Sequence, residues 1–383
     1  MFVIAEGPGD LVFLSWIRES DSADAGIRDA YEQIAEHLKS RHAVLLHERI
    51  FGEVGAAAAV LGIRQGIMER LGGYLGPPPT YVEGKPCVGS GIAGIHALAV
   101  RAAGSESMSP IEWNGRICGR LVEGAGAWYM GLSDIGQLIP GENRRPPQEE
   151  TRETLGLVQQ VLERHRWSFN DVYRTWFYLH DILDWYDEFN GVRNDAFRRL
   201  GLFDRPLGVI PASTGIQGRG ARGNWCTLDL FATRPLNGHV FHVERLINPR
   251  QNEAPEYGSA FSRGLSVTID RCRYLFVSGT ASINDQGHSV HPEDFDRQTE
   301  RTLETVDSLL AAGGAGLKDI CQATAFVKRA GDVEGFRQIV RRMGLDEIPA
   351  ICTIGDVCRE ELLFELDATA VLPAETVDHE TES

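Results

Sequence analysis

Leu275-Phe-Val-Ser-Gly-Thr-Ala-Ser-Ile283 is an apolar run that ends in small polar residues, and Val357-Cys-Arg-Glu-Glu-Leu-Leu-Phe-Glu365-Leu-Asp-Ala368 is a second run with a carboxylate inside an apolar stretch. Apolar runs of this length, bounded by polar residues, are typical of β-strands. An acid in apolar surroundings tends to have a raised pKa and can give up a proton near neutral pH. Glu365 is therefore the best catalytic candidate in the chain.

The same strand also has a less specific interpretation. Period-two alternation puts Leu363, Glu365 and Asp367 on one face and apolar residues on the other. A face that carries two acids is ordinarily solvated, so a wet surface strand is the alternative to a catalytic one.

The composition indicates a globular protein with more than one domain. The chain has 383 residues, of which 43% are hydrophobic and 24% charged, so two or three domains are expected. The formal net charge of -16 makes nucleic acids and anionic membrane surfaces poor partners. No apolar run approaches the ~20 residues of a membrane span, and the start of the chain does not resemble a signal peptide.

The cysteines indicate neither a disulfide framework nor a zinc site. There are seven of them, an odd number, and no pair has CxxC spacing. Scattered thiols fit a reducing compartment, so we expect a cytoplasmic protein.

One order of elements occurs three times along the chain. Each block has an apolar strand ending in Ser, an amphipathic helix, a second strand, a second helix, and a Pro-led turn that opens a last strand. We expect these elements at 11–15, 26–41, 43–50, 56–71 and 77–80 in the first block, at 128–133, 147–165, 172–179, 184–200 and 211–214 in the second, and at 275–278, 293–312, 320–327, 331–343 and 349–352 in the third. Repeats of this size indicate duplicated domains, which we place at 1–103, 104–247 and 248–383.

The third block resembles the RidA family, also called the YjgF/UK114 family. The resemblance rests on Phe261-Ser-Arg-Gly264, Leu275-Phe-Val-Ser-Gly279, Phe326-Val-Lys328 and Phe364-Glu-Leu-Asp-Ala368. That family forms trimers with active sites between neighbouring subunits. The resemblance therefore implies an α/β (α+β) fold of tandem RidA-like, chorismate-mutase-like domains arranged as an intramolecular pseudo-trimer.

One departure from that family bears on function. Its imine-hydrolysing members hold the substrate carboxylate with an Arg after Pro-Ala, whereas this chain has Ile351 in the third block and Ser213 in the second. An imine or enamine deaminase is therefore a secondary hypothesis, together with a metabolite-binding protein that has no turnover.

Residues from about 80 to 372 resemble the chorismatases, which are built on the same fold. The matching stretches are Ala127-Trp-Tyr-Met-Gly131, Arg174-Thr-Trp-Phe-Tyr178, Pro211-Ala-Ser-Thr-Gly-Ile216, Glu256-Tyr-Gly258 and Val357-Cys-Arg-Glu-Glu-Leu-Leu-Phe-Glu365. The Arg-Thr-Trp-x-Tyr and Cys-Arg-Glu-x-Leu-Leu-x-Glu patterns are fairly specific when they occur together in this order.

Chorismatases cleave the enol-ether side chain of chorismate and release pyruvate. The resemblance implies that members that form 3-hydroxybenzoate have Gly in the Ser-Gly-Thr turn and Cys seven residues before the acid. Members that stop at a dihydroxy-cyclohexadiene carboxylate have Ala at both positions. This chain has Gly279 and Cys358, so we predict 3-hydroxybenzoate and pyruvate as products, with the diene-forming chorismate hydrolase as the alternative.

The chemistry of the reaction suggests roles for further residues. Protonating the terminal carbon of an enol ether produces an oxocarbenium ion, and we assign this general-acid step to Glu365. Chorismate is a dicarboxylate, so an acidic protein must supply local cations. The candidate substrate-binding residues are Arg174, Tyr178, Arg193, Thr214, Gly215, Tyr257, Arg263 and Gly279.

Cys358 is the second catalytic candidate, as a proton acceptor or as a nucleophile. A thiol needs a lowered pKa to act as a thiolate, and the adjacent Arg359 can lower it if its side chain points the same way. The reaction requires no metal or organic cofactor. An internal pseudo-trimer closes its own ring of interfaces, so we expect a monomer, with a dimer as the alternative.

Overall fold

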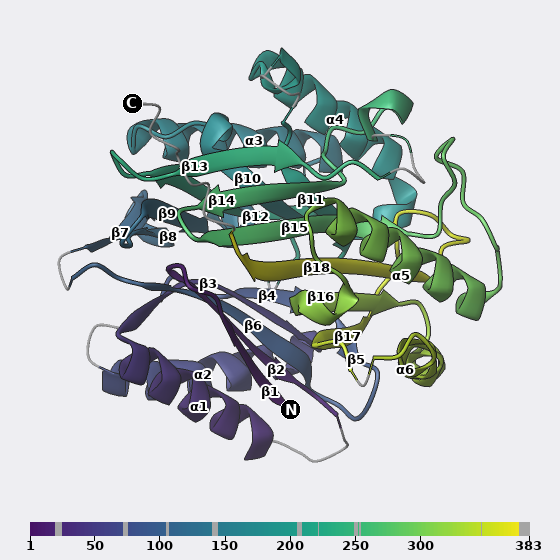
Figure 1. Ribbon diagram of the computed structural model, residues 1–383, viewed down its shortest axis with the longest axis horizontal. Helices are drawn as coiled ribbons and strands as arrows, with labels where there is room; N and C mark the ends of the chain where they lie inside the picture. Colours follow the sequence, from purple (N-terminus) through teal and green to yellow (C-terminus); the bar gives the residue numbers. More distant parts are fainter. Residues whose placement is uncertain are drawn as a thin grey trace, which may run out of the picture.

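The computed structural model describes residues 1–19, 25–71, 76–104, 107–139, 145–204, 209–220, 222–248, 252, 254–345 and 347–374 (Figure 1). Three β-sheets meet in the middle of the molecule, and the helices lie on its outside. The seven cysteines are all free thiols. Within the described ranges, no helix is both long enough and apolar enough to cross a membrane.

Each sheet belongs mainly to one block of the sequence. The first has the strand order β1-β2-β6-β3-β4, the second β11-β10-β12-β9-β8-β7, and the third β13-β14-β15-β18-β16-β17-β5. In the first block the elements are β1 (Phe2–Glu6), β2 (Leu11–Ile17), α1 (Ala25–Arg41), β3 (Ala43–Gly52), α2 (Ala57–Met68), β4 (Thr80–Glu83), β5 (Lys85–Pro86) and β6 (Ile92–Arg101).

The other two blocks follow in chain order. The second contains β7 (Met108–Trp113), β8 (Arg116–Glu123), β9 (Ala127–Leu132), α3 (Pro147–Arg164), β10 (Val172–Leu179), α4 (Tyr186–Arg199), β11 (Ala212–Gln217) and β12 (Cys226–Pro235). The third sheet and its helices are β13 (Phe241–Arg245), β14 (Gly264–Ile269), β15 (Cys272–Ala281), α5 (Phe295–Ala312), β16 (Ile320–Val327), α6 (Val333–Arg342), β17 (Ala350–Ile354) and β18 (Phe364–Pro373).

The predicted threefold repeat of elements is confirmed, and the strand pairing repeats with it. In the first block β2 pairs antiparallel with β6, β6 antiparallel with β3, and β3 parallel with β4. The same pattern holds for β9, β12, β10 and β11 and for β15, β18, β16 and β17. The predicted α+β fold of tandem RidA-like domains is therefore correct.

Local chemistry explains where the helices form, as α5 illustrates. Asp294 caps its first turn by accepting a hydrogen bond from the backbone N of Arg297 (3.0 Å). Leu303, Val306 and Leu310 then recur at three- and four-residue spacing and are buried against the third sheet. The helix ends before Gly313, a residue that commonly stops helices.

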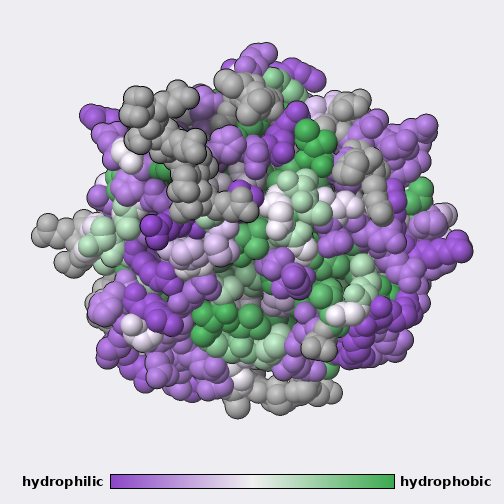
Figure 2. Space-filling model, viewed as in Figure 1, coloured by the Kyte–Doolittle hydropathy of each residue, from purple (hydrophilic) through white to green (hydrophobic). Residues whose placement is uncertain are grey.

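The sheets are buried on both faces, which positions the functional site. Their outer faces pack on the helices, and their inner faces form one central cluster with contributions from all three blocks, including Phe13, Tyr129 and Tyr274. As a result β3, β10 and β16 are buried at every position. On the outside, Figure 2 shows hydrophobic residues gathered toward the middle of the viewed face, with hydrophilic residues around them.

The contacts between blocks run in a ring. β11 of the second block packs on β15 of the third, β17 of the third packs on β2 and β6 of the first, and β3 of the first packs on β8 and β9 of the second. This ring supports the prediction of an internal pseudo-trimer. The predicted domain limits stay predictions, although β13 (Phe241–Arg245), which lies before the limit at 248, joins the third sheet.

A buried carboxyl pair lies at the junction of the first and second blocks. Asp229 accepts hydrogen bonds from the Thr80 hydroxyl and from the backbone N of Asp134, both at 2.7 Å, and His47 Nε2 is 3.0 Å from its other oxygen. Burial and the nearby Asp229 raise the pKa of Asp134 to about 8. The native protein therefore holds a proton on Asp134 that the unfolded chain releases above pH ~4.

Replacing Asp134 by Asn is expected to stabilise the protein at pH 8. Because the native pKa exceeds the unfolded one, stability falls as pH rises from ~4 to ~8, and Asn removes this term. Asn also suits the left-handed backbone at this position (φ 52°). Thermal unfolding should show a melting temperature higher by roughly 2–4 °C at pH 8, with the difference vanishing near pH 4.

Asp181→Asn is the matched control for this experiment, because Asp181 has the same backbone conformation (φ 51°) but an exposed side chain. Its melting temperature should not depend on pH in this way. Equal melting temperatures of Asp134→Asn and the unchanged protein at pH 8 would contradict the prediction.

Candidate active site

A pocket between the second and third blocks brings together six of the ten predicted site residues. The second block contributes α4 and β11, and the third contributes β15, β18 and the segments that precede β14 and β18. The predicted residues that line the pocket are Arg193, Gly215, Arg263, Gly279, Cys358 and Glu365.

Glu365 is buried at the inner end of this pocket. It lies in β18 between Ala281 of β15 and Phe326 of β16, and only 4% of it is exposed. Burial, together with the neighbouring Asp367, raises the pKa of Glu365 to about 8, although Arg174 acts in the opposite direction. The acid is therefore protonated at neutral pH, and the alternative of a solvated acid face is wrong because Glu365 is only 4% and Asp367 only 3% exposed.

A β-bulge in β15 makes room for this carboxyl. The register between β15 and β18 shifts between Val277 and Thr280. A Cβ at Gly279 would overlap the Glu365 carboxylate oxygen and lie 3.0 Å from its Cδ and 3.3 Å from Thr214 Cγ2. Bulges often direct side chains at active sites. Here the lack of a side chain on Gly279 leaves the space that the Glu365 carboxyl occupies.

Arg174 and Thr214 lie behind the pocket, where both bind Asp367. Arg174 Nη2 donates to Asp367 Oδ2 at 2.9 Å, and the Thr214 hydroxyl donates to the same oxygen at 2.9 Å. Arg174 also lies over the ring of Trp176, 4.6 Å from its centroid. Arg174 is thus already paired with a buried carboxylate, and neither residue lines the pocket.

Of the remaining predicted residues, too, some line the pocket and others do not. Tyr178 is buried in the central cluster, where its ring meets Phe51 edge-on at 6.2 Å, and it does not line the pocket. Gly215 does line it, and a Cβ at this position would lie 3.7 Å from Tyr186 Cε2 and 3.8 Å from Phe189 Cε1. The side chain of Tyr257 lies outside the described residues.

Two buried arginines supply positive charge to the pocket that Glu365 lines. The Arg193 guanidinium lies 5.0 Å from the ring centroid of Phe189 and 5.4 Å from that of Phe261, and its Nη2 donates to Asn190 Oδ1 at 2.7 Å. The Arg263 guanidinium lies 5.7 Å from the Phe261 ring on the same wall. Cations held on aromatic rings keep their charge where little water reaches, so this wall favours an anionic ligand.

Arg359 does not lower the pKa of Cys358 below its ordinary value. Burial and the nearby Glu365 raise the pKa of Cys358 to about 12, and the opposing effect of Arg359 is smaller. Arg359 Nη1 is instead bound to the backbone O of Gly287 at 2.7 Å. Cys358 is therefore a neutral thiol at physiological pH.

The enclosed part of the pocket is small, about 60 Å³. It adjoins an outer pocket of about 620 Å³, and Tyr186, Ser259, Cys358 and Arg359 line both. A ring-sized ligand therefore has to displace side chains at this boundary, of which Tyr186 and Arg359 are the largest.

Sequence reasoning did not nominate Tyr186, Ser259 or Phe261, although all three line the pocket. Only their nearness in sequence to predicted residues could have pointed to them. Phe261 stands two residues before Arg263, and Tyr186 begins the helix that carries Arg193. Ser213, at the position of the Arg in imine-hydrolysing RidA proteins, also lines the pocket, and its backbone N donates to the Ser278 hydroxyl at 2.7 Å.

Known proteins resemble the chain at two levels. The family model described as Endoribonuclease L-PSP matches residues 253–372. The 3-hydroxybenzoate synthase of Streptomyces hygroscopicus is 30% identical over 253 residues, which cover 58% of this chain and 69% of that protein. The 3-aminoacrylate deaminase RutC of Acinetobacter baylyi is 27% identical over 97 residues, 25% of this chain and 77% of that protein.

The structural comparison covers nearly the whole chain. A crystal structure of a chorismatase superposes with a TM-score of 0.60 and 17% sequence identity, covering 95% of this chain and all of that one. At this identity the match shows a common fold.

Proposed function

This chain belongs to the chorismatase family, and from that membership we propose that it cleaves the enolpyruvyl ether of chorismate to 3-hydroxybenzoate and pyruvate. The observation that carries the proposal is Glu365, a buried carboxyl with a pKa raised to about 8, in a pocket walled by Arg193 and Arg263. A protonated acid at neutral pH and two cations are what cleavage of a dicarboxylic enol ether needs.

In the proposed mechanism the arginines orient the substrate and Glu365 transfers the proton. Arg193 and Arg263 bind the substrate carboxylates, which places the methylene carbon of the enol ether over the Glu365 carboxyl. Glu365 protonates that carbon, and the resulting oxocarbenium ion weakens the bond between the ring and the ether oxygen. Arg174 and Thr214 act as positioning residues, because they hold Asp367 two residues along the same strand.

The atom balance of the reaction gives Glu365 a second task. Chorismate is converted to hydroxybenzoate and pyruvate without consuming water, so one hydrogen moves from the ring portion to the methylene carbon. To place the oxygen at the 3-position, the neighbouring ring hydroxyl attacks the carbon that the ether oxygen leaves, and the resulting epoxide opens at the hydroxyl's original carbon while the hydrogen of the attacked carbon moves to the oxygen. The ring hydroxyl gives up its proton as it attacks. The Glu365 carboxylate left by the first step lies in the same pocket and takes this proton back, which regenerates the acid.

The test of the proposed function is direct. Purified protein is incubated with chorismate, pyruvate is followed through lactate dehydrogenase and NADH, and the aromatic product is identified by chromatography and mass. Stoichiometric pyruvate and 3-hydroxybenzoate are expected. Pyruvate with the dihydroxy diene would indicate the diene-forming hydrolase, and no pyruvate would reject chorismate cleavage. Pyruvate from an aminoacrylate-generating system would instead favour the imine or enamine deaminase.

Cys358→Ala is expected to shift the product from 3-hydroxybenzoate toward the dihydroxy diene. The neutral thiol lies near Glu365 and lines both pockets, so its loss opens space for water near the reacting ring. The product ratio is measured by chromatography after complete conversion. Cys87→Ala is the matched control, since Cys87 is a partly buried thiol that lines neither part of this pocket. An unchanged ratio in Cys358→Ala would show that the thiol does not control the product.

A further inference from the structure

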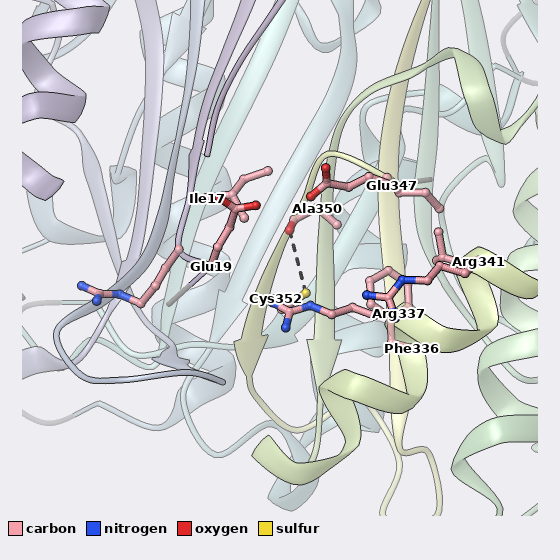
Figure 3. Close-up of a pocket in the computed structure, with 11 residues that line it drawn as sticks. Ile17, Glu19, Phe336, Arg337, Arg341, Glu347, Ala350 and Cys352 are labelled. Carbon is pink, nitrogen blue, oxygen red and sulfur yellow. Dashed lines mark hydrogen bonds between the residues drawn. The ribbon is translucent and has the colours of Figure 1, made fainter. Parts of the chain in front are cut away.

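A second pocket, of about 350 Å³, lies between the third and first blocks (Figure 3). α6 and β17 supply one wall, and residues at the end of β2 supply the other. The corresponding elements of the other two blocks, α4, β11 and the end of β15, enclose the candidate active site. The repeat has therefore produced two cavities of similar construction at two junctions.

This second pocket is not built for proton transfer. β6, the counterpart of β18, has His96 and Arg101 as its ionisable residues, and neither lines the pocket. His96 is held between the Ser15 hydroxyl (2.8 Å) and the backbone O of Ala323 (2.9 Å). The acids among the described lining residues are Glu19 and Glu347, and both are exposed.

The charges of the second pocket favour an anion. Arg18, Arg337 and Arg341 line it, against Glu19 and Glu347. Figure 3 shows the Arg337 guanidinium beside Cys352 on the wall formed by β17. Arg337 Nη1 is 3.8 Å from Glu334 in a partly exposed pair of the same helix. Such pairs contribute little, so a ligand carboxylate can replace Glu334 at low cost.

The apolar residues of the lining favour a ligand in which the anionic group is attached to a flat apolar ring. Five apolar residues line the same pocket, namely Ile17, Phe336, Val340, Ile348 and Ala350. A cavity of about 350 Å³ has room for a single ring with small substituents. We propose that this pocket is a non-catalytic binding site for a small aromatic monocarboxylate, with Arg337 as the carboxylate partner. The assignment goes beyond the proposed function and does not depend on it, although hydroxybenzoate belongs to this class of ligand.

Calorimetric titration of the full chain with benzoate tests the site without any turnover. Arg337→Gln should weaken benzoate binding at this site at least tenfold and leave the melting temperature unchanged. Arg342→Gln is the matched control, because Arg342 lies on the same helix but pairs with Glu300 and does not line the pocket. Arg193→Gln, in the candidate active site, should retain binding at the second pocket, and benzyl alcohol should not bind there.

Two outcomes would overturn the proposal. One is benzoate binding to Arg337→Gln with the number of sites and affinity of the unchanged protein. The other is loss of all binding in Arg193→Gln, which would assign every bound benzoate to the candidate active site. The titration measures binding alone, so a protein that does not cleave chorismate can still confirm or overturn this proposal.

Discussion

Glu365→Gln is expected to lower the rate of pyruvate release from chorismate by roughly 10²–10⁴-fold, the contribution typical of a general acid. Gln has nearly the shape of the protonated carboxyl but cannot donate a proton to carbon. Substrate binding should change little, because Arg193 and Arg263 remain. The coupled lactate dehydrogenase assay measures the effect as a loss in kcat with a nearly constant KM.

The pH dependence of the unchanged protein tests the same assignment. The active form carries a protonated Glu365, so kcat/KM should fall as pH rises through about 8. The fall should have the slope of one proton. A rate that stays constant between pH 7 and 9.5 would count against Glu365 as the proton donor.

Stability measurements separate a chemical defect from misfolding. The native pKa of Glu365, about 8, exceeds the value of 4.5 for an unperturbed Glu, so burial of this acid destabilises the fold progressively between these pH values. Glu365→Gln should therefore melt no lower than the unchanged protein at pH 8. Glu361→Gln, an exposed residue of the same segment, is the matched control and should keep full activity. A Glu365→Gln protein with more than a tenth of the activity would refute the mechanism.

Gly279→Ala is expected to reduce kcat at least tenfold and to shift the product toward the dihydroxy diene. The added Cβ overlaps the Glu365 carboxylate oxygen and lies 3.0 Å from Cδ, closer than side chains ordinarily approach. The acid must rotate away, because Thr214 Cγ2 at 3.3 Å limits movement of the strand. Turnover and product ratio are measured together. Gly156→Ala, at an open position in α3, is the control and should retain both.

A double-mutant cycle shows whether Ala at position 279 acts through the acid. If it does, adding Gly279→Ala to Glu365→Gln should lower kcat by a much smaller factor than the same change does in the unchanged protein. Fully additive losses would mean that Gly279 acts by another route, such as space for the substrate.

The sequence predicted the elements well because their patterns are local. Alternation and three- and four-residue spacing follow from strand and helix geometry and require no knowledge of the neighbours. The expected helix at 147–165 is Pro147–Arg164, and the expected strand at 320–327 is Ile320–Val327. The strand expected at 275–278 extends over Cys272–Ala281 because a bulge lets it continue past Gly279.

The site was only partly predictable because its residues come from two blocks. Glu365, Gly279 and Cys358 lie in adjacent segments of one block, and local motifs identified them. Arg174 was predicted to bind substrate, yet β10 is a central strand whose inner side chains reach the junction of the blocks, where Arg174 pairs with Asp367. No local pattern distinguishes an arginine that faces a ligand from one that faces a buried acid.

What the amino-acid sequence determined by itself is therefore the order of the five repeated elements in each block, the threefold repeat and the presence of an acid in an apolar strand. Only the tertiary structure decided that this acid is buried, that Arg193 and Arg263 line its pocket while Arg174 pairs with Asp367, and that the junctions of the blocks differ in what they contain. The physical reason is that periodicity is a property of neighbours along the chain, whereas desolvation and pKa depend on neighbours in space.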